Sequence, residues 1–218
     1  MKAQLNVCCL GGLLLVVASG IVGAQSASVR PDLGSAKMIE NWVIDGNGEW
    51  RVLDGKLALI KGGTAIAGDV HRLMAIAVLK TDPFVRVTVD TELRLTAPLD
   101  STRRDMAVIF GYESPMRFYY AHFGGITDAG NNGIFLVDRA DRRRIDPPTP
   151  PPLLKDQNWH HVRVERDGAT GKTEVYFDDS ATPVYSVVDT TIRSGRVGLG
   201  SLNDYGEFRN IVITGTGK

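Results

Sequence analysis

The fold is decided by the stretch VRVTVDTELRL, residues 85–95, in which apolar and polar side chains alternate. Successive side chains of an extended strand point to opposite faces of a sheet. One face therefore carries Val85, Val87, Val89, Thr91, Leu93 and Leu95, and the other carries Arg86, Thr88, Asp90, Glu92 and Arg94. This period of two predicts a strand with one face in a core and the other toward solvent.

Further strand-like runs surround this one, and most are bounded by turn residues. They lie at residues 106–112, 116–123, 133–138, 160–166, 173–177, 196–200 and 208–214. Earlier in the chain, residues 49–53 and 56–60 flank Asp54-Gly55, a dipeptide that accepts the positive φ angles of a two-residue hairpin turn. No convincing helical period connects the runs, which predicts mainly antiparallel sheets. The expected fold class is all-β, a two-sheet antiparallel β-sandwich.

The charge balance is neutral, with 25 basic and 25 acidic side chains among 218 residues. This balance argues against nucleic acid as a partner. The apolar fraction of 43% is that of an ordinary globular protein, so the chain is expected to fold around a core.

The first 24 residues are predicted to be a signal peptide. Residues 5–24 are almost entirely apolar or small, and Val22 and Ala24 fit a cleavage site after residue 24. The alternative is an uncleaved membrane anchor, because the apolar run approaches the length that spans a bilayer. With cleavage, the protein is expected to be secreted or periplasmic, without stable membrane insertion.

Three segments are expected along the chain: the signal peptide at 1–24, a lead-in at 25–40, and one sandwich domain at 41–218. The lead-in has room for a short helix around residues 32–40. Both cysteines, Cys8 and Cys9, lie in the signal peptide, so no disulfide is expected in the mature chain.

Several motifs together resemble those of a known group of domains. They are WRVLDGKL at 50–57, MAVIFGY at 106–112, RFYYAHF at 117–123, WHHVRV at 159–164, VYFDD at 175–179, GRVGLG at 195–200 and FRNI at 208–211. In this order they resemble the concanavalin A-like jelly-roll domains of the laminin G-like group and the related 3-keto-disaccharide hydrolase-like domains. The resemblance spans residues 42–214. It implies a secreted sandwich whose concave face or rim loops contact carbohydrate.

One difference from the hydrolase-like domains weakens the prediction of hydrolase activity. The hydrolase-like domains carry an Asn-Ser-Gly-Ile type segment after the central strand, whereas DMAVI follows here at residues 105–109. Glycan binding is therefore the main functional prediction. The alternatives are a glycan-cleaving enzyme, either a 3-keto-glycoside hydrolase-like enzyme or a polysaccharide lyase, and a structural or adhesive module that binds proteins.

The segment YYAHFGG at residues 119–125 is the first candidate site. Tyr120 and His122 share one face of the expected strand, so a phenol and an imidazole are candidates for a catalytic acid and base. Arg117 and Tyr119 face the other way. The alternative is that Tyr120 and His122 make ordinary structural hydrogen bonds.

Polar residues near this strand are candidates for substrate binding. Asp128, Asn131 and Asn132 follow it in a loop, and Arg117 and Tyr119 lie within it. A mixed charge run at residues 138–144 adds Arg139 and Arg143, whose planar guanidinium groups suit an acidic glycan. The alternative for this run is a solvated hairpin end whose charges pair with one another.

Metal binding is predicted only as a calcium option. Asp178 and Asp179, or Asp204 with Glu207, offer oxygen ligands, but the spacing of a calcium loop is absent. His160 and His161 are adjacent in a strand and point to opposite faces, so they do not share a metal. No cofactor is required by the sequence.

Two further sets of residues are candidates for contact with a glycan. The polar face of residues 85–95 has the side chains to line a groove, although mixed charges on a solvent-facing strand also keep a sheet soluble. Trp42, Trp50 and Trp159 can stack on sugar rings or pack in the core. For all three, and especially for Trp159, packing is the favoured interpretation.

Overall fold

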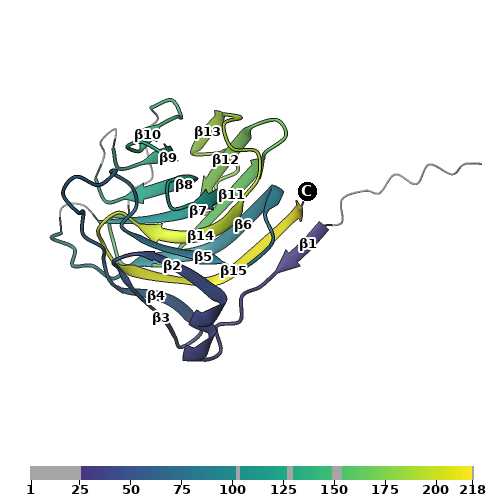
Figure 1. The fold of residues 1–218 in the computed structure, drawn as a ribbon. Helices are drawn as coiled ribbons and strands as arrows, with labels where there is room; N and C mark the ends of the chain where they lie inside the picture. Colours follow the sequence, from purple (N-terminus) through teal and green to yellow (C-terminus); the bar gives the residue numbers. More distant parts are fainter. Residues whose placement is uncertain (1–25, 102–103, 127–129, 149–153, 218) are drawn as a thin grey trace, which may run out of the picture.

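The computed structural model describes residues 26–101, 104–126, 130–148 and 154–217, and two antiparallel sheets dominate it (Figure 1). The predicted all-β two-sheet sandwich is confirmed. The predicted signal peptide and Asp128 lie outside the described residues. No helix in the described ranges is long and apolar enough to cross a membrane.

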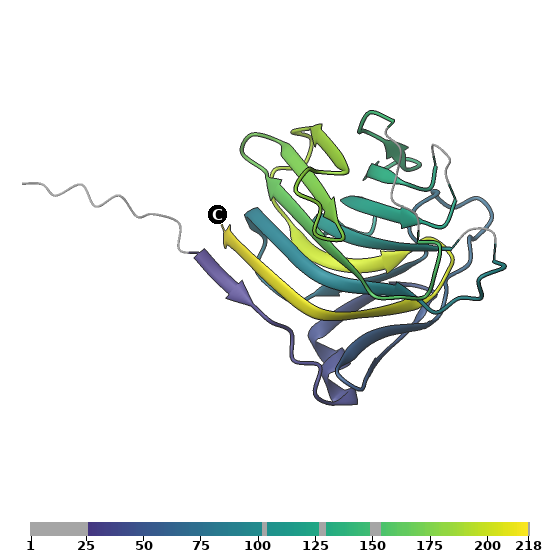
Figure 2. The same cartoon turned by 180° about the vertical axis from the view of Figure 1, so that it is seen from behind.

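The larger sheet has eight strands. Seven follow one another in the order β13 (Tyr185–Val188), β12 (Lys172–Phe177), β11 (His160–Asp167), β6 (Phe84–Leu95), β15 (Gly206–Gly217), β4 (Lys56–Lys61) and β3 (Glu49–Leu53). The eighth, β1 (Ser26–Val29), pairs with the end of β15 (Figure 2). The predicted hairpin joins β3 to β4, and both Asp54 and Gly55 have positive φ angles, 49° and 74°.

The smaller sheet has seven strands. Their order is β10 (Arg143–Arg144), β9 (Gly133–Asp138), β8 (Arg117–Gly124), β7 (Asp105–Ser114), β14 (Arg196–Ser201), β5 (Ala75–Leu79) and β2 (Trp42–Gly46). A 3-10 helix, η1 (Ala36–Asn41), precedes β2. The expected lead-in at 25–40 therefore contains most of this short helix and also β1, a strand that the sequence did not predict.

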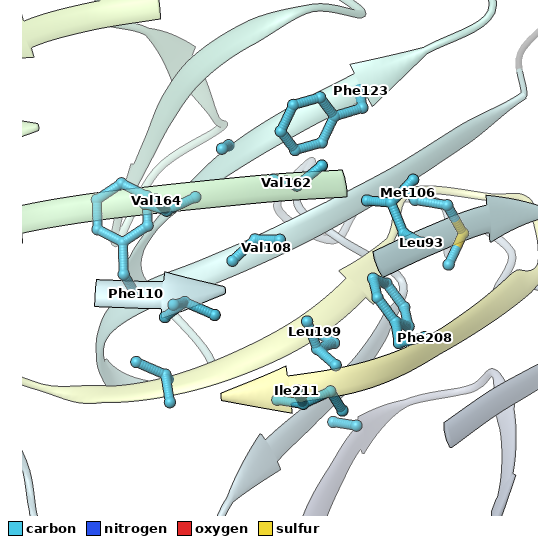
Figure 3. Close-up of a cluster of buried hydrophobic side chains, with 14 of the residues drawn as sticks. Leu93, Met106, Val108, Phe110, Phe123, Val162, Val164, Leu199, Phe208 and Ile211 are labelled. Carbon is cyan, nitrogen blue, oxygen red and sulfur yellow. The ribbon is translucent and has the colours of Figure 1, made fainter. Parts of the chain in front are cut away.

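The main core lies between the two sheets (Figure 3). The larger sheet contributes Leu93, Val162, Val164, Phe208 and Ile211, and the smaller sheet contributes Met106, Val108, Phe110, Phe123 and Leu199. On β6 the alternation is as predicted, since Val87, Val89, Thr91, Leu93 and Leu95 are buried. Trp42 and Trp50 are also buried in this core. Removing this apolar surface from water is the main stabilisation of the sandwich.

The outer face of the seven-stranded sheet is also buried. A second apolar cluster on it includes Ile76, Val78, Ile109, Phe118, Tyr120, Phe135 and Val137, and His122 lies beside them. We call this surface the closed face. Segments 62–74 and 139–142 meet beside it, where the Arg142 N–H donates to the His71 carbonyl (2.8 Å) and the His71 N–H donates to Asp141 (2.9 Å). Continuous apolar runs, as in β8, are typical of strands buried on both faces.

The outer face of the eight-stranded sheet is different. It carries polar and aromatic side chains at alternate positions, among them Asp90, Glu92, Arg94, His161, Arg163, Tyr176, Glu207 and Arg209. These residues are half-buried or exposed. We call this surface the open face.

Candidate functional site

Tyr120 and His122 lie together on the closed face, as their spacing predicted, with ring centroids 5.7 Å apart. Both side chains are 0% exposed. The Tyr120 hydroxyl accepts a hydrogen bond from Arg142 Nη1 (2.9 Å), and the Arg142 guanidinium covers the Phe135 ring at 4.7 Å from its centroid. The predicted catalytic residues therefore form a buried pair, surrounded by aromatic neighbours and the 139–142 segment, and their role in catalysis stays a prediction.

His122 is held by a partner that sequence reasoning did not single out. Its Nε2 lies 2.8 Å from Asp105 Oδ2, while its Nδ1 has no hydrogen-bond partner among the described residues. Asp105 also accepts hydrogen bonds from the Ser201 hydroxyl (3.0 Å) and from the Leu202 N–H (2.6 Å). Burial alone would raise the pKa of Asp105, but His122 and the backbone donors lower it below its ordinary value. An acidic residue at the start of an otherwise apolar strand is the signal that could have identified it.

Burial also fixes the protonation of the phenol. It raises the pKa of Tyr120, and the partial opposition of Arg142 does not reverse this. Tyr120 therefore stays a neutral phenol at physiological pH. Among the buried side-chain polar atoms of Tyr120, His122 and Asp105, only His122 Nδ1 has no hydrogen-bond partner within the described residues. These residues therefore contribute satisfied hydrogen bonds to the packing of the closed face.

Asn132, one of the two asparagines predicted to bind substrate, makes hydrogen bonds within the loop after β8. Asn132 accepts a hydrogen bond from the Gly124 N–H (2.9 Å) and donates one to the Ile126 carbonyl (2.6 Å). Asn131 and Asn132 are both buried. The Asn132 amide therefore holds the chain after β8, and a binding role for the two buried asparagines stays a prediction.

Arg117 and Tyr119 lie on the other side of β8, as predicted. Tyr119 is buried in the main core, and its hydroxyl donates to Asp189. Arg117 forms ion pairs with Glu113 (2.7 Å) and Asp138. Neither residue reaches the closed face, so the structure does not bring them together with His122.

The arginines of the 138–144 run have partners, but only the Arg139–Asp138 pair lies within the run. Arg139 is 73% exposed and contacts Asp138 at 3.2 Å, and Arg143 is 61% exposed and lies 3.9 Å from Asp189. Arg144 turns inward and makes two hydrogen bonds of 2.9 Å to the buried carboxylate of Asp146. The run therefore offers no cluster of free guanidinium groups to an acidic glycan.

Asp178 and Asp179 form the turn after β12, and both have positive φ angles. Asp178 lies 2.9 Å from His160 Nδ1, and Asp179 lies 2.6 Å from His161 Nδ1. No group of three or more metal-ligating side chains is arranged for an ion within the described ranges. The calcium site at these two residues stays a prediction, and the contacts seen are with histidines.

Asp204 and Glu207, the other pair predicted as calcium ligands, lie in different surroundings. Burial and the nearby Asp105 raise the pKa of Asp204 to about 6. Glu207 instead forms ion pairs with Lys56 (2.9 Å) and Arg94 (2.6 Å). Glu207 thus belongs to the charged network of the open face.

Charged side chains of the open face are connected across the strands. Arg94 pairs with Glu207, and Arg209 pairs with Glu92 at 2.5 Å. Their guanidinium carbons lie 4.7 and 4.1 Å from the centroid of the half-buried Trp159 ring. Two ion-paired arginines therefore hold one tryptophan at the edge of this face.

A second aromatic residue lies further along the same face. Arg163 stacks on Tyr176, 4.2 Å from the ring centroid, and pairs with Glu165 at 3.1 Å. Beside it, His161 lies between Asp90 (2.7 Å) and Asp179 (2.6 Å). Although partial burial lowers the pKa of His161, the two carboxylates raise it above its ordinary value.

Two hollows indent the open face. One of about 350 Å³ has walls that include Arg86, Thr88, Glu165, Lys172, Glu174 and Thr214. The other, of about 260 Å³, is lined by His161, Arg163, Tyr176, Asp179, Ser180 and Ala181. Together they place hydrogen-bond donors, acceptors and an aromatic ring along one surface, groups that are common in ligand sites.

Neither family models nor curated proteins match this sequence. Solved structures do. The carbohydrate binding module CBM66 from Bacillus subtilis is 15% identical, with a TM-score of 0.58 over 78% of this chain and 93% of the module. The metal-free carbohydrate recognition domain of Emp46p is 10% identical, with a TM-score of 0.54 over 88% of this chain and 96% of that domain. A Bauhinia forficata lectin solved with GalNAc is 12% identical, with a TM-score of 0.52 over 88% and 98%.

At these identities the likeness shows the fold alone. It confirms the expected jelly-roll sandwich. Membership of the laminin G-like group and a relation to 3-keto-disaccharide hydrolase-like domains stay predictions.

Proposed function

We propose that this protein binds a glycan on the open face of its eight-stranded sheet. The observation that supports the proposal is that a ligand can reach the open face but not the side chains of the closed face. The closed face holds the predicted catalytic pair but is filled, whereas the open face has two hollows and presents Trp159 and Tyr176 to solvent beside charged side chains. Aromatic rings beside fixed hydrogen-bonding groups are suited to a sugar, which has both apolar ring faces and hydroxyl groups.

The length of the open face supports an extended ligand. From Arg86 to Arg94 the strand β6 advances eight residues, which is about 26 Å at the usual rise. Several sugar rings in a row can lie along that distance. We therefore propose an oligosaccharide or polysaccharide rather than a single sugar.

The charges of this face support a neutral glycan. Arg94, Arg163 and Arg209 each have a carboxylate partner. An acidic glycan would have to compete with these carboxylates for the guanidinium groups, whereas sugar hydroxyls can bond to their free edges. Catalysis by His122 is not part of the proposal, because its side chain is inaccessible. Export remains part of it, on the apolar pattern of residues 1–24.

A glycan-array screen of the purified protein, with and without Ca²⁺, tests the proposal. For the best glycan found, Trp159→Ala and Tyr176→Ala are each expected to weaken binding by about tenfold, as for an aromatic contact at the centre of an interface. Tyr120→Phe, on the closed face, is the matched control and is expected to bind as the parent does. Incubation with the glycan, followed by an assay for new reducing or unsaturated ends, checks for cleavage.

Two outcomes would contradict the proposal. The first is no binding to any glycan, which would favour a structural or protein-binding module. The second is loss of binding in Tyr120→Phe with full binding in both open-face variants, which would move the site to the closed face.

A further inference from the structure

A third hollow lies away from the open face, where three parts of the chain meet. It has a volume of about 490 Å³, and its walls include Thr81, Pro83, Tyr112, Glu113, Ser194 and Arg196. These residues come from the turn between β5 and β6, the end of β7, and the start of β14. Its volume is within the range of about 300–1,000 Å³ that is usual for small-molecule sites.

The walls of this hollow are fixed by the backbone. Phe84 and Gly195 exchange two hydrogen bonds, of 2.9 and 3.0 Å, which join the β5–β6 turn to the start of β14. Gly195 also lies against β7 so closely that a Cβ atom there would be 2.3 Å from the Gly111 carbonyl carbon. Gly195 is thus a close-approach glycine, and the hollow is preformed rather than assembled on binding.

Arg196 gives this hollow a free cation. Its guanidinium carbon lies 5.6 Å from the centroid of the Tyr112 ring, and it makes no ion pair with any residue in the described ranges. The arginines of the open face discussed above all have a carboxylate partner. Arg196 therefore keeps its donors available for a ligand.

Uncharged donors lie around this guanidinium. The Oγ1 atom of Thr81 is buried without a partner among the described residues, and Ser194 adds a second hydroxyl. The Tyr112 hydroxyl stays protonated, because burial and the charge of Asp45 raise the pKa of Tyr112 to about 12. These groups can hydrogen-bond to oxygens of a ligand bound beside Arg196.

The single carboxylate in the walls has a partner outside them, Arg117, which also pairs with Asp138. Glu113 lies 2.7 Å from Arg117 Nε. Asp82 is exposed on the β5–β6 turn but is not part of the walls. The hollow therefore has an unpaired positive charge with hydroxyl groups around it.

We propose that this hollow binds a small hydroxylated carboxylate, such as a uronic acid, with the carboxylate on Arg196. A guanidinium and a carboxylate match as two parallel hydrogen bonds, and the hydroxyls of Thr81, Ser194 and Tyr112 suit the sugar hydroxyls. This site is separate from the open face and does not depend on glycan binding there.

Titration of the ¹⁵N-labelled protein with D-glucuronate tests the proposal. Glucuronate is expected to shift the amide resonances of Gly195 and Arg196, whereas D-glucose and acetate, which lack the carboxylate and the hydroxyls respectively, bind far more weakly. Arg196→Ala is expected to weaken glucuronate binding by about ten- to a hundredfold, as for loss of a charged hydrogen-bond pair. Arg193→Ala removes an exposed arginine three residues away that is not in the walls, and is the matched control.

Two further variants and a second ligand test the same site. Should Arg196→Ala fail to fold, Arg196→Lys and Tyr112→Phe test the same contacts, and both are expected to weaken binding. An oligosaccharide that ends in glucuronate distinguishes an acidic sugar within a glycan from a free acid. The proposal is overturned by the absence of shifts up to about 10 mM glucuronate, by equal binding of glucose, or by an equal loss in Arg193→Ala.

Discussion

The two outer faces of the sandwich are made from strands of similar length, yet one is filled and the other is open. At the closed face, β8 is buried on both of its sides, with Phe118 and Tyr120 toward that face and Tyr119 and Phe123 toward the main core. On the open face, β6 alternates strictly from Val87 to Leu95. The difference shows that the same kind of polar residue predicts solvent exposure in one type of strand and burial in the other. In an alternating strand it marks solvent, whereas in a continuous apolar run it marks a buried hydrogen-bonded pair.

Aromatic truncation should give the largest contrast between the faces. Phe135→Ala on the closed face is expected to lower the free energy of unfolding by about 3–5 kcal/mol, because it leaves a cavity beneath Arg142. Tyr176→Ala on the open face is expected to cost less than about 1 kcal/mol, as for a surface substitution. Urea unfolding of both variants measures the two values. Equal costs would show that the open face is as tightly packed as the closed one.

Replacing Asp105, the acidic partner of His122, should have the next largest effect on the free energy of unfolding. Asp105→Asn is expected to lower the free energy of unfolding by about 2–3 kcal/mol at neutral pH, because an amide cannot accept from every donor that now bonds to the carboxylate. The pKa of Asp105 is lowered in the folded protein. Its contribution is therefore complete above the unfolded pKa of about 3.9 and is lost as the pH falls toward the folded value.

Urea unfolding at neutral pH and below about pH 4 measures this dependence. The gap between the parent and Asp105→Asn should narrow in acid. Asp204→Asn is the control, because the raised pKa of Asp204 makes its charge unfavourable at neutral pH, so this variant should not lose stability there. A gap for Asp105→Asn that widens in acid would contradict the assigned direction.

Among the closed-face variants, the smallest effect is expected for Tyr120→Phe. It removes one hydrogen bond to Arg142, which keeps its second bond of 2.6 Å to the Gly130 carbonyl. We expect a loss of about 1 kcal/mol in the free energy of unfolding. Thermal and urea unfolding check this value. A loss above about 3 kcal/mol would mean that the hydroxyl, rather than the aromatic packing, holds the 139–142 segment in place.

Local sequence patterns predicted much of the fold. The alternation at residues 85–95 identified the buried side of β6, and Asp54-Gly55 identified a hairpin. The same rule correctly placed Tyr120 and His122 on one face. It could not show what covers that face, because the 62–74 and 139–142 segments meet there through contacts between residues about seventy positions apart.

The candidate sites were harder to predict for a related reason. Trp159 gains its setting from Arg94 and Arg209, which are distant in sequence and adjacent only after β6 and β15 pair. Arg196 differs from Arg94, Arg163 and Arg209 on the open face in having no carboxylate partner among the described residues, while it lies in the wall of a hollow. Neither property is a pattern within a segment, so spacing and composition contain no signal for it.

The pairing of β1 with β15 has a consequence for how the chain reaches its folded state. Ser26 lies opposite Thr216, so the first and last strands of the sandwich close on each other. This contact joins two segments that are far apart in the sequence, and contacts of this kind are slow to form because the intervening chain must close into a loop. During synthesis the first strand therefore has no partner until the last has emerged. The larger sheet is therefore completed only after residues 206–217 have been synthesised, which makes β1 the first of its strands to emerge and among the last to be paired.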